Sequence, residues 1–153
     1  MRIRAARRDD FEAVTGLLEE LGRPRVLGES REDECRAVYD EQIVDPDTHH
    51  IVAEDDTGVV AFCSLHFRPR LNHPSQEAWI PDLIVTERAR RAGIGQALLD
   101  EAERRARERG CHFLALESGY QRAEAHHLYR MSRMRDVGKS FVKDLRARGL
   151  KRR

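Results

Sequence analysis

The sequence predicts a single α/β domain, residues 1–153, built around a mixed β-sheet. Its length is ordinary for one domain, and neither an internal repeat nor a linker interrupts it. Segments with the two-residue period of strands and segments with the helical period follow one another in the order β–α–α–β–β–β–α–β–α–β. Strands and helices interspersed in this way are typical of a sheet with helices packed on its faces.

The first part of the chain predicts one strand and two helices. Polar and apolar residues alternate over residues 2–6, as in a short strand. A helix is expected after Asp10, because apolar residues recur at helical spacing from Phe11 until Gly22. The segment GRPRVLGES predicts a loop, and a second helix is expected from Ser30 to about Val44.

A β-hairpin and a third strand are predicted next. Residues 49–55 and 59–67 have the composition of strands, and the turn DTG joins them. After a loop at residues 68–76, a third strand is expected at residues 77–85. This strand contains Pro81, which has no N–H donor, so a bulge or interruption is expected near it. Without a bulge, alternation places one set of side chains on one face (Ile80, Asp82 and Ile84) and the other set opposite (Trp79, Pro81, Leu83 and Val85).

The last part predicts two helices and two strands. A helix is expected at residues 93–109, and Gly110 is a natural residue to end it. A strand at residues 112–118, a helix at 122–134 and a final strand at 137–145 complete the pattern, before a basic tail.

The composition excludes several classes of protein. Charged residues make up 36% of the chain, but the net charge is only +1, which argues against a dedicated nucleic-acid binder. No apolar run approaches the ~18 residues of a membrane span, and the N-terminus lacks the apolar core of a signal peptide, so a cytoplasmic location is expected. The three cysteines have no metal-binding spacing and are expected to be reduced.

The pattern Arg90-x-x-Gly93-x-Gly95 follows a predicted strand and opens a long predicted helix. Glycine lets a backbone turn sharply and approach a ligand closely. Unpaired N–H groups at a helix N-terminus favour an anion such as pyrophosphate, and Arg88, Arg90 and Arg91 add positive charge nearby. The alternative is an ordinary turn followed by a solvated basic helix start.

Together with DLIV before it, this pattern resembles the acetyl-CoA signature of the GCN5-related N-acetyltransferases, the GNAT superfamily. The resemblance runs over nearly the whole chain and is most specific between Trp79 and Tyr129. It implies a three-layer sandwich with about four helices, a mostly antiparallel sheet, and a splayed pair of strands at the cofactor site. It also implies that acetyl-CoA is the co-substrate, bound by the strand backbone and the glycine turn (Leu83, Ile84, Val85, Arg90, Arg91, Ala92, Gly93, Ile94, Gly95 and Gln96).

Acetyl transfer to an amine sets three chemical requirements. The ammonium, with a pKa near ~10, must lose a proton before its nitrogen can attack. A backbone N–H near Leu83 or Ile84 is a candidate donor to the oxyanion. By resemblance, Tyr129 is the general acid that protonates the departing thiolate. Asp82 is the candidate base, directly or through a water, with a structural or substrate-orienting role as the alternative; other candidates for the base are Glu77, His66 and His73.

The segments LNHPSQEAWIPDLIV and RAEAHHLY look like the aminoalkylphosphonate N-acetyltransferase branch and its small-amine relatives. The resemblance therefore implies acetyl transfer to a primary amine of a small molecule by direct attack in a ternary complex. Arg68 and Arg70 would favour an amine that also carries an acid group. The alternatives are a protein lysine or N-terminal acetyltransferase and a non-catalytic acyl-CoA-binding regulatory module. The resemblance leaves a homodimer open.

The sequence also departs from the family pattern. Ser118 and Gly119 stand where many members have an asparagine, and Arg133 and Met134 stand where they have Gly-Phe. No metal is expected, because the neighbours in the pairs His49-His50 and His126-His127 point in different directions on a strand or helix.

Overall fold

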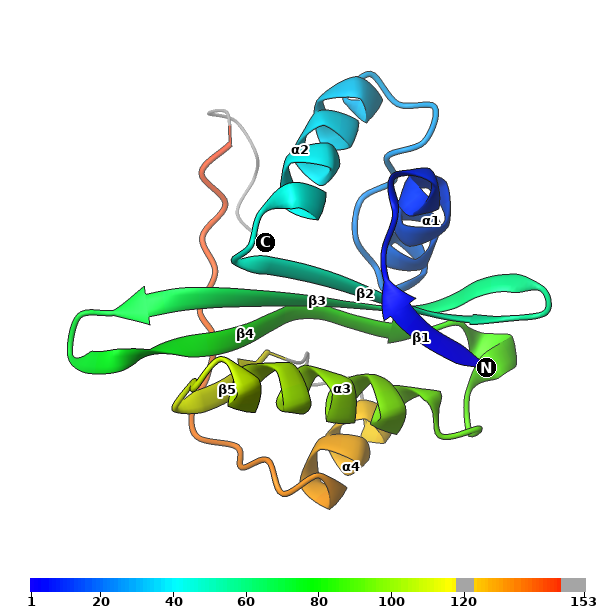
Figure 1. Ribbon diagram of the computed structural model, residues 1–153. Helices are drawn as coiled ribbons and strands as arrows, with labels where there is room; N and C mark the ends of the chain where they lie inside the picture. The colour runs from blue at the N-terminus through cyan, green and yellow to red at the C-terminus, as the bar shows by residue number, and fades with distance from the viewer. Residues whose placement is uncertain (118–122, 147–153) are drawn as a thin grey trace.

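A five-stranded sheet forms the middle layer of the protein in a computed structural model, which describes residues 1–117 and 123–146 (Figure 1). The strands lie in the order β1-β2-β3-β4-β5. The first four are antiparallel, and β5 runs parallel to β4. Their bounds are β1 (Arg2–Ala5), β2 (Thr48–Asp55), β3 (Gly58–Arg70), β4 (His73–Val85) and β5 (Phe113–Leu116).

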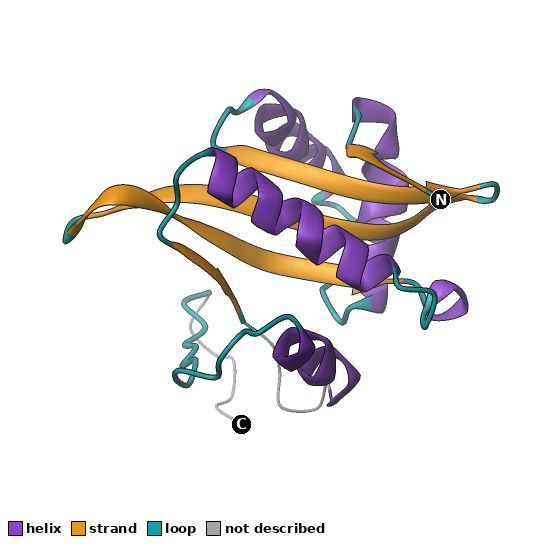
Figure 2. Cartoon of the chain, turned by 60° about the horizontal axis from the view of Figure 1, so that its bottom comes forward, coloured by secondary structure: helices purple, strands orange, loops and turns teal. Residues whose placement is uncertain are grey.

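Helices cover both faces of this sheet, which gives the predicted three layers. Helices α1 (Phe11–Glu20) and α2 (Glu32–Val44) lie on one face, and α3 (Ile94–Glu108) and α4 (Ala123–Met131) lie on the other. Figure 2 shows α3 running across the sheet, with α4 beside it near β5. The predicted α/β class with a mixed sheet and about four helices is confirmed.

The sheet separates two apolar cores. Alternate residues of β2 and β3, such as Ile51 and Leu65, pack against Leu98 and Leu99 of α3. The intervening residues, such as Val52 and Phe62, pack against α1 and α2 on the opposite face. Because successive side chains of a strand point to opposite faces, two-sided burial requires nearly continuous apolar strands, as the sequence of β2 and β3 shows.

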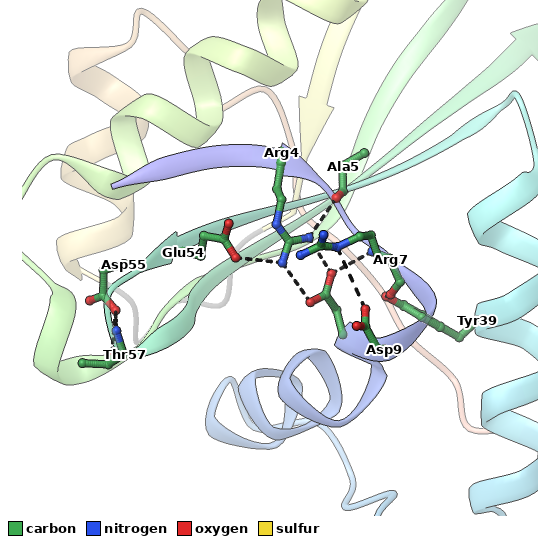
Figure 3. Close-up of polar contacts among 9 residues, drawn as sticks. Arg4, Ala5, Arg7, Asp9, Tyr39, Glu54, Asp55 and Thr57 are labelled. Atoms are coloured by element: carbon green, nitrogen blue, oxygen red, sulfur yellow. Dashed lines mark hydrogen bonds and ion pairs between the residues drawn. The ribbon is translucent and has the colours of Figure 1, made fainter.

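Buried ion pairs hold β1 to the helical layer. The Arg4 guanidinium donates to both carboxylate oxygens of Asp10, at 2.7 and 3.0 Å, and to Glu54 at 2.9 Å. Figure 3 shows Arg4 reaching Glu54 on β2, and shows Tyr39 of α2 beside Arg7. The Tyr39 hydroxyl donates to the Arg7 carbonyl oxygen at 2.6 Å, which fixes the ring of Tyr39 over the sheet.

Most predicted elements are present, with several corrections. The loop expected at residues 68–76 is largely strand, and only Leu71 and Asn72 form the turn between β3 and β4. Helix α2 begins at Glu32 rather than at Ser30, and α4 ends at Met131. The helix start expected at Arg122 and the Ser118-Gly119 position lie outside the described residues.

The final strand expected at residues 137–145 is wrong: this segment contains no strand. Its apolar side chains are between 83% and 91% exposed (Val137, Phe141, Val142 and Leu145). A strand forms only where a neighbouring backbone pairs with it, and a local sequence pattern does not reveal whether such a neighbour is available.

Candidate active site

A β-bulge at Pro81 shapes the centre of the site. Ser64 of β3 pairs with Asp82, and His66 pairs with Trp79, so that Leu65 alone lies opposite both Ile80 and Pro81. The bulge expected near this proline is confirmed. The faces assigned without a bulge are therefore wrong: Ile80 packs in the core beneath α3, as do Leu83 and Val85, whereas Ile84 packs beneath α1. The extra residue reverses the alternation from this point onward.

The second half of β4 has an edge open toward β5. The parallel pairing between the two strands covers only residues 77–80 of β4 and ends at Leu116 of β5. Beyond this point, residues 81–85 have no strand partner on that side within the described part of the chain. Leu83, Ile84 and Val85, the candidate cofactor-binding residues of this strand, lie along that edge. Free backbone groups in such a splay are able to pair with an amide-bearing ligand.

The turn from Arg90 to Gln96 presents a row of backbone N–H groups. Arg91 and Gly93 both have positive φ, of 65° and 79°, which curls the backbone before α3. No residue within 1–117 and 123–146 accepts a hydrogen bond from the N–H groups of residues 91–96. Such a curled turn at the N-terminus of a long helix is an anion-binding arrangement. All the residues predicted to bind pyrophosphate are therefore brought together (Arg90, Arg91, Ala92, Gly93, Ile94, Gly95 and Gln96).

The arginines around this turn have different neighbours. Arg90 donates from Nε to the Val85 carbonyl oxygen at 3.0 Å, which ties the turn to the end of β4. Arg88 lies 3.6 Å from Asp55 at the β2–β3 turn. Arg91 is largely exposed, and its Nη2 lies 3.3 Å from the Glu124 carboxylate. Arg91 is thus the most accessible of the three cations for an added phosphate.

Helix α4 carries Tyr129 and packs beside the turn. Leu128 and Tyr129 are half-buried against the core beneath α3. A Cβ built on Gly95 would lie 3.1 Å from Leu128 Cδ2, so the backbone of the turn and the side chains of α4 are in close contact. The Ser132 hydroxyl donates to Gln96 Oε1 at 3.0 Å, a second contact between the same segments. These contacts place Leu128, the residue before Tyr129, against the turn.

Charged side chains line the face of β3 and β4 opposite to α3. Asp82 Oδ1 accepts a hydrogen bond from Arg23 Nε at 2.8 Å. Glu77 binds two arginines, Arg68 at 3.0 Å and Arg70 at 3.3 Å. The ion pair of Asp82 with Arg23 was not anticipated from the sequence, because Arg23 lies in a loop 59 residues away.

Of the two histidines proposed as alternative bases, the structure places only His66 near Asp82. His66 lies on β3, and Asp82 pairs with the residue two positions before it, Ser64. His73 lies at the exposed start of β4, where its ring stacks on His112 with centroids 3.7 Å apart. The fully exposed turn at Leu71 adjoins it, so His73 is remote from the bulge.

His66 ends a buried chain of hydrogen bonds that sequence analysis missed. Its Nε2 lies 2.9 Å from Ser64 Oγ, and Ser64 Oγ lies 3.2 Å from His50 Nδ1. His50 Nε2 lies 2.7 Å from Gln42 Oε1 of α2. Burial lowers the pKa of His50 to about 4, and burial also lowers the pKa of His66. The chain therefore joins three elements through neutral imidazoles.

The adjacent histidines of β2 point to opposite faces. His49 lies 3.2 Å from Arg105 of α3, whereas His50 stacks on Tyr39 of α2. The described residues contain no group of three or more histidine, cysteine or acidic side chains placed to hold a metal ion. Among the same residues, no helix has the length and apolar character to cross a membrane.

The fold is one that a known acetyltransferase shares. The structure of glucosamine-6-phosphate N-acetyltransferase from Arabidopsis thaliana superposes with a TM-score of 0.78, covering 94% of this chain and 97% of that one at 19% identity, a likeness of fold. The model described as Acetyltransferase (GNAT) family matches residues 9–132, so the chain belongs to the GNAT family.

Two relatives are similar in sequence. The aminoalkylphosphonate N-acetyltransferase of Salmonella typhimurium is 30% identical over 127 residues, which cover 83% of this chain and 80% of that protein. The "Uncharacterized N-acetyltransferase YhdJ" of Bacillus subtilis (strain 168) is 40% identical over 76 residues, or 49% of this chain. That match spans about half of the Bacillus protein, 52% of its length.

Proposed function

We propose that this chain transfers acetyl from acetyl-CoA to the primary amine of a small molecule, by direct attack within a ternary complex. The observation that carries the proposal is the row of N–H groups at residues 91–96, which have no acceptor within residues 1–117 and 123–146, beside the open edge of β4. The N–H groups of the turn suit a pyrophosphate, and the open edge of β4 suits a chain of amides. Acetyl-CoA contains both groups. Acetyl-CoA would supply the activated acyl group as a thioester.

Different residues of this chain would bind the cofactor, stabilise the oxyanion and protonate the leaving group. The amides from Arg91 to Gln96 would hold the pyrophosphate, with Arg91 as the accessible cation. An N–H of the open β4 edge, at Leu83 or Ile84, would donate to the carbonyl oxygen as negative charge develops on it. Tyr129, beside the turn through its neighbour Leu128, would protonate the departing sulfur.

Asp82 faces the other side of the sheet, where we place the amine. Its carboxylate is only 20% exposed and is held by Arg23 from the loop that follows α1. A fixed carboxylate attracts an ammonium and orients it toward the bulge, which favours the substrate-orienting role for Asp82.

An acid group on the acceptor would explain the arginines near this face. Arg68 and Arg70 share the carboxylate of Glu77, so among the ion pairs of residues 1–117 and 123–146 two positive charges meet one negative charge there. Arg68 also stacks on Trp79, with its guanidinium carbon 4.4 Å from the ring centroid, which holds it at the strand surface. The similarity to an aminoalkylphosphonate N-acetyltransferase is consistent with such an acceptor.

A screen of candidate amines tests which chemical class of acceptor the protein uses. Aminophosphonates, amino acids and neutral alkylamines of matched length would each be supplied with acetyl-CoA, and the released thiol measured. We expect acid-bearing amines to have the highest kcat/KM. Faster turnover of the neutral amines would refute the acid-bearing acceptor, and acetylation of peptides alone would favour the protein-acetyltransferase alternative.

A further inference from the structure

The chain of hydrogen bonds from Gln42 to His66 has a single direction. A carbonyl oxygen only accepts, so His50 Nε2 donates to Gln42 Oε1. In neutral His50 the other nitrogen, Nδ1, then carries a lone pair and accepts from the Ser64 hydroxyl. The Ser64 oxygen, having donated its proton, accepts from His66 Nε2. His66 is thereby held as the Nε2–H tautomer, with its lone pair on Nδ1.

Packing keeps each member of this chain in place. His50 is 8% exposed and stacks on Tyr39 at an interplanar angle of 4°, and Tyr39 is itself held by the Arg7 carbonyl. Ser64 is 3% exposed. The His66 ring packs against Trp79, with centroids 5.6 Å apart. A rigid serine and histidine behind His66 fix the orientation of its ring.

Burial disfavours the imidazolium form of His66 and lowers its pKa, and the charges around the ring act in both directions. Asp82 of β4 and Asp45, before β2, stabilise an imidazolium, whereas Arg68 on the same strand and His50 on β2 oppose it. Arg23 and Glu77 bind Asp82 and Arg68 respectively, and so moderate both effects. Asp82 Oδ1 accepts a hydrogen bond from Arg23 Nε, whereas His66 keeps a lone pair on Nδ1.

On this basis, we propose that His66 is the residue that accepts the proton of the substrate ammonium, and that Ser64 and His50 are positioning residues that set its tautomer. The inference rests on the proposed acetyltransferase function. It identifies the base, which the sequence left open between Asp82, Glu77, His66, His73 and a water.

The proton transfer moves one hydrogen from the substrate ammonium to His66. One N–H bond of the ammonium breaks and its electron pair stays on nitrogen, while a new N–H bond forms at His66 Nδ1. The imidazole becomes imidazolium and passes this proton to solvent. After nitrogen attacks the thioester, its second N–H bond breaks and that proton passes to solvent, while Tyr129 gives its proton to the departing thiolate and regains one from solvent. The products are the acetamide, free CoA thiol and one proton.

Ring nitrogen NMR on the intact protein tests the tautomer without requiring activity. We expect the ¹⁵N shifts of His66 to show the Nε2–H form at pH 7, with a titration midpoint below the ordinary histidine value. Ser64→Ala should mix the two tautomers and move the midpoint lower, because the imidazolium loses its hydrogen-bond acceptor. A dominant Nδ1–H form in the unmutated protein would overturn the proposal.

Kinetics test the role of His66. His66→Gln should lower kcat by about 100-fold or more with an unchanged Kd for acetyl-CoA, since general base catalysis contributes about 10²–10⁴. Ser64→Ala should lower kcat/KM by roughly 3- to 10-fold and shift the acidic limb of the pH profile downward. An unchanged kcat in His66→Gln would overturn the proposal and leave the acetyltransferase function intact.

Ser75→Ala is the matched control. Ser75 Oγ also lies between two imidazoles, 3.0 Å from His73 Nδ1 and 2.9 Å from His112 Nδ1, but at the start of β4, away from Asp82. We expect it to leave kcat and the pH profile unchanged. If it shifts the profile as Ser64→Ala does, the effect is not specific to the His66 chain and the proposal fails. Absence of turnover with every amine in the unmutated protein would refute the proposed function, and the NMR result would still decide the tautomer.

Discussion

Gly95 and Leu128 lie so close that a Cβ on Gly95 would come within 3.1 Å of Leu128 Cδ2. This contact joins the first turn of α3 to the helix that carries Tyr129. The same built Cβ would lie 3.7 Å from Val85, at the end of the open β4 edge. The absence of a side chain at Gly95 thus lets three parts of the candidate site meet.

Gly95→Ala should impair catalysis more than stability. Leu128 must move by a few tenths of an ångström, which displaces the neighbouring Tyr129, while alanine improves helix propensity by up to about 1 kcal/mol. We expect kcat to fall about three- to tenfold, with a small change in Tm. In a double-mutant cycle, Leu128→Ala should relieve part of the loss. Gly16→Ala is the control, because Gly16 is also helical and a Cβ there meets nothing within 4 Å.

Gly93→Ala tests the amide-lined turn. The φ of Gly93 is 79°, a conformation that costs an alanine about 1–2 kcal/mol. We expect the Kd for CoA, measured by calorimetry, to rise about tenfold as the N–H groups lose their alignment. Gly110→Ala has nearly the same φ, 78°, at the opposite end of α3. It should lower stability by a similar amount and leave the Kd unchanged; equal Kd values in the two variants would refute the role of the turn.

Tyr129→Phe separates an enzyme from a CoA-binding module. Removal of the phenolic proton should lower kcat about 10²-fold or more, as for other general acids, with an unchanged Kd for CoA. Steady-state thiol release and calorimetry on the same preparation would measure both quantities. Full activity in this variant would show that Tyr129 is not the general acid.

The ion pair of Arg4 with Asp10 should make stability depend on pH. Burial raises the pKa of Asp10, but hydrogen bonds from Arg4 and Arg7 outweigh it, and the net pKa lies below the ordinary value of 3.8. A carboxyl with a lowered folded pKa stabilises the protein above its unfolded pKa, and the stabilisation is lost as pH falls through the folded pKa.

Asp10→Asn should therefore lower the free energy of unfolding by about 2 kcal/mol at pH 7, because Arg4 loses its charged hydrogen bonds to Asp10 while it keeps the ion pair with Glu54. Urea unfolding of both proteins should show this difference shrinking below about pH 4. A difference that stays constant from pH 7 to pH 3 would contradict this account of the ion pair.

The bulge at Pro81 and the failed strand at residues 137–145 show what the sequence could and could not predict. The bulge was predictable because proline removes a donor from one known position. The strand expected at residues 137–145 was not predictable in this way, because a strand forms only if a backbone elsewhere in the molecule pairs with it. Like the bulge, residues 83–85 and 90–96 were identifiable as cofactor-binding candidates because the motif that carries the family resemblance is local in the sequence.

The pairing of His50 with Ser64 was beyond the sequence for a different reason. Counting back from the turn, where Asp55 pairs with Gly58, a regular hairpin would place His50 opposite Cys63. An irregularity between Ala53 and Glu54 shifts the register by one residue, so that His50 pairs with Ser64 instead. One inserted residue reverses which side chains share a face. The hydrogen-bond chain to His66 exists only because of that shift.

The most direct test of the account is a time course that measures released CoA thiol and acetylated amine together, in the presence of acetyl-CoA and an acid-bearing primary amine. We expect both products to appear in a one-to-one ratio, and thiol release to stop when the amine is omitted. Tight CoA binding without amine-dependent thiol release, for any amine tested, would contradict it.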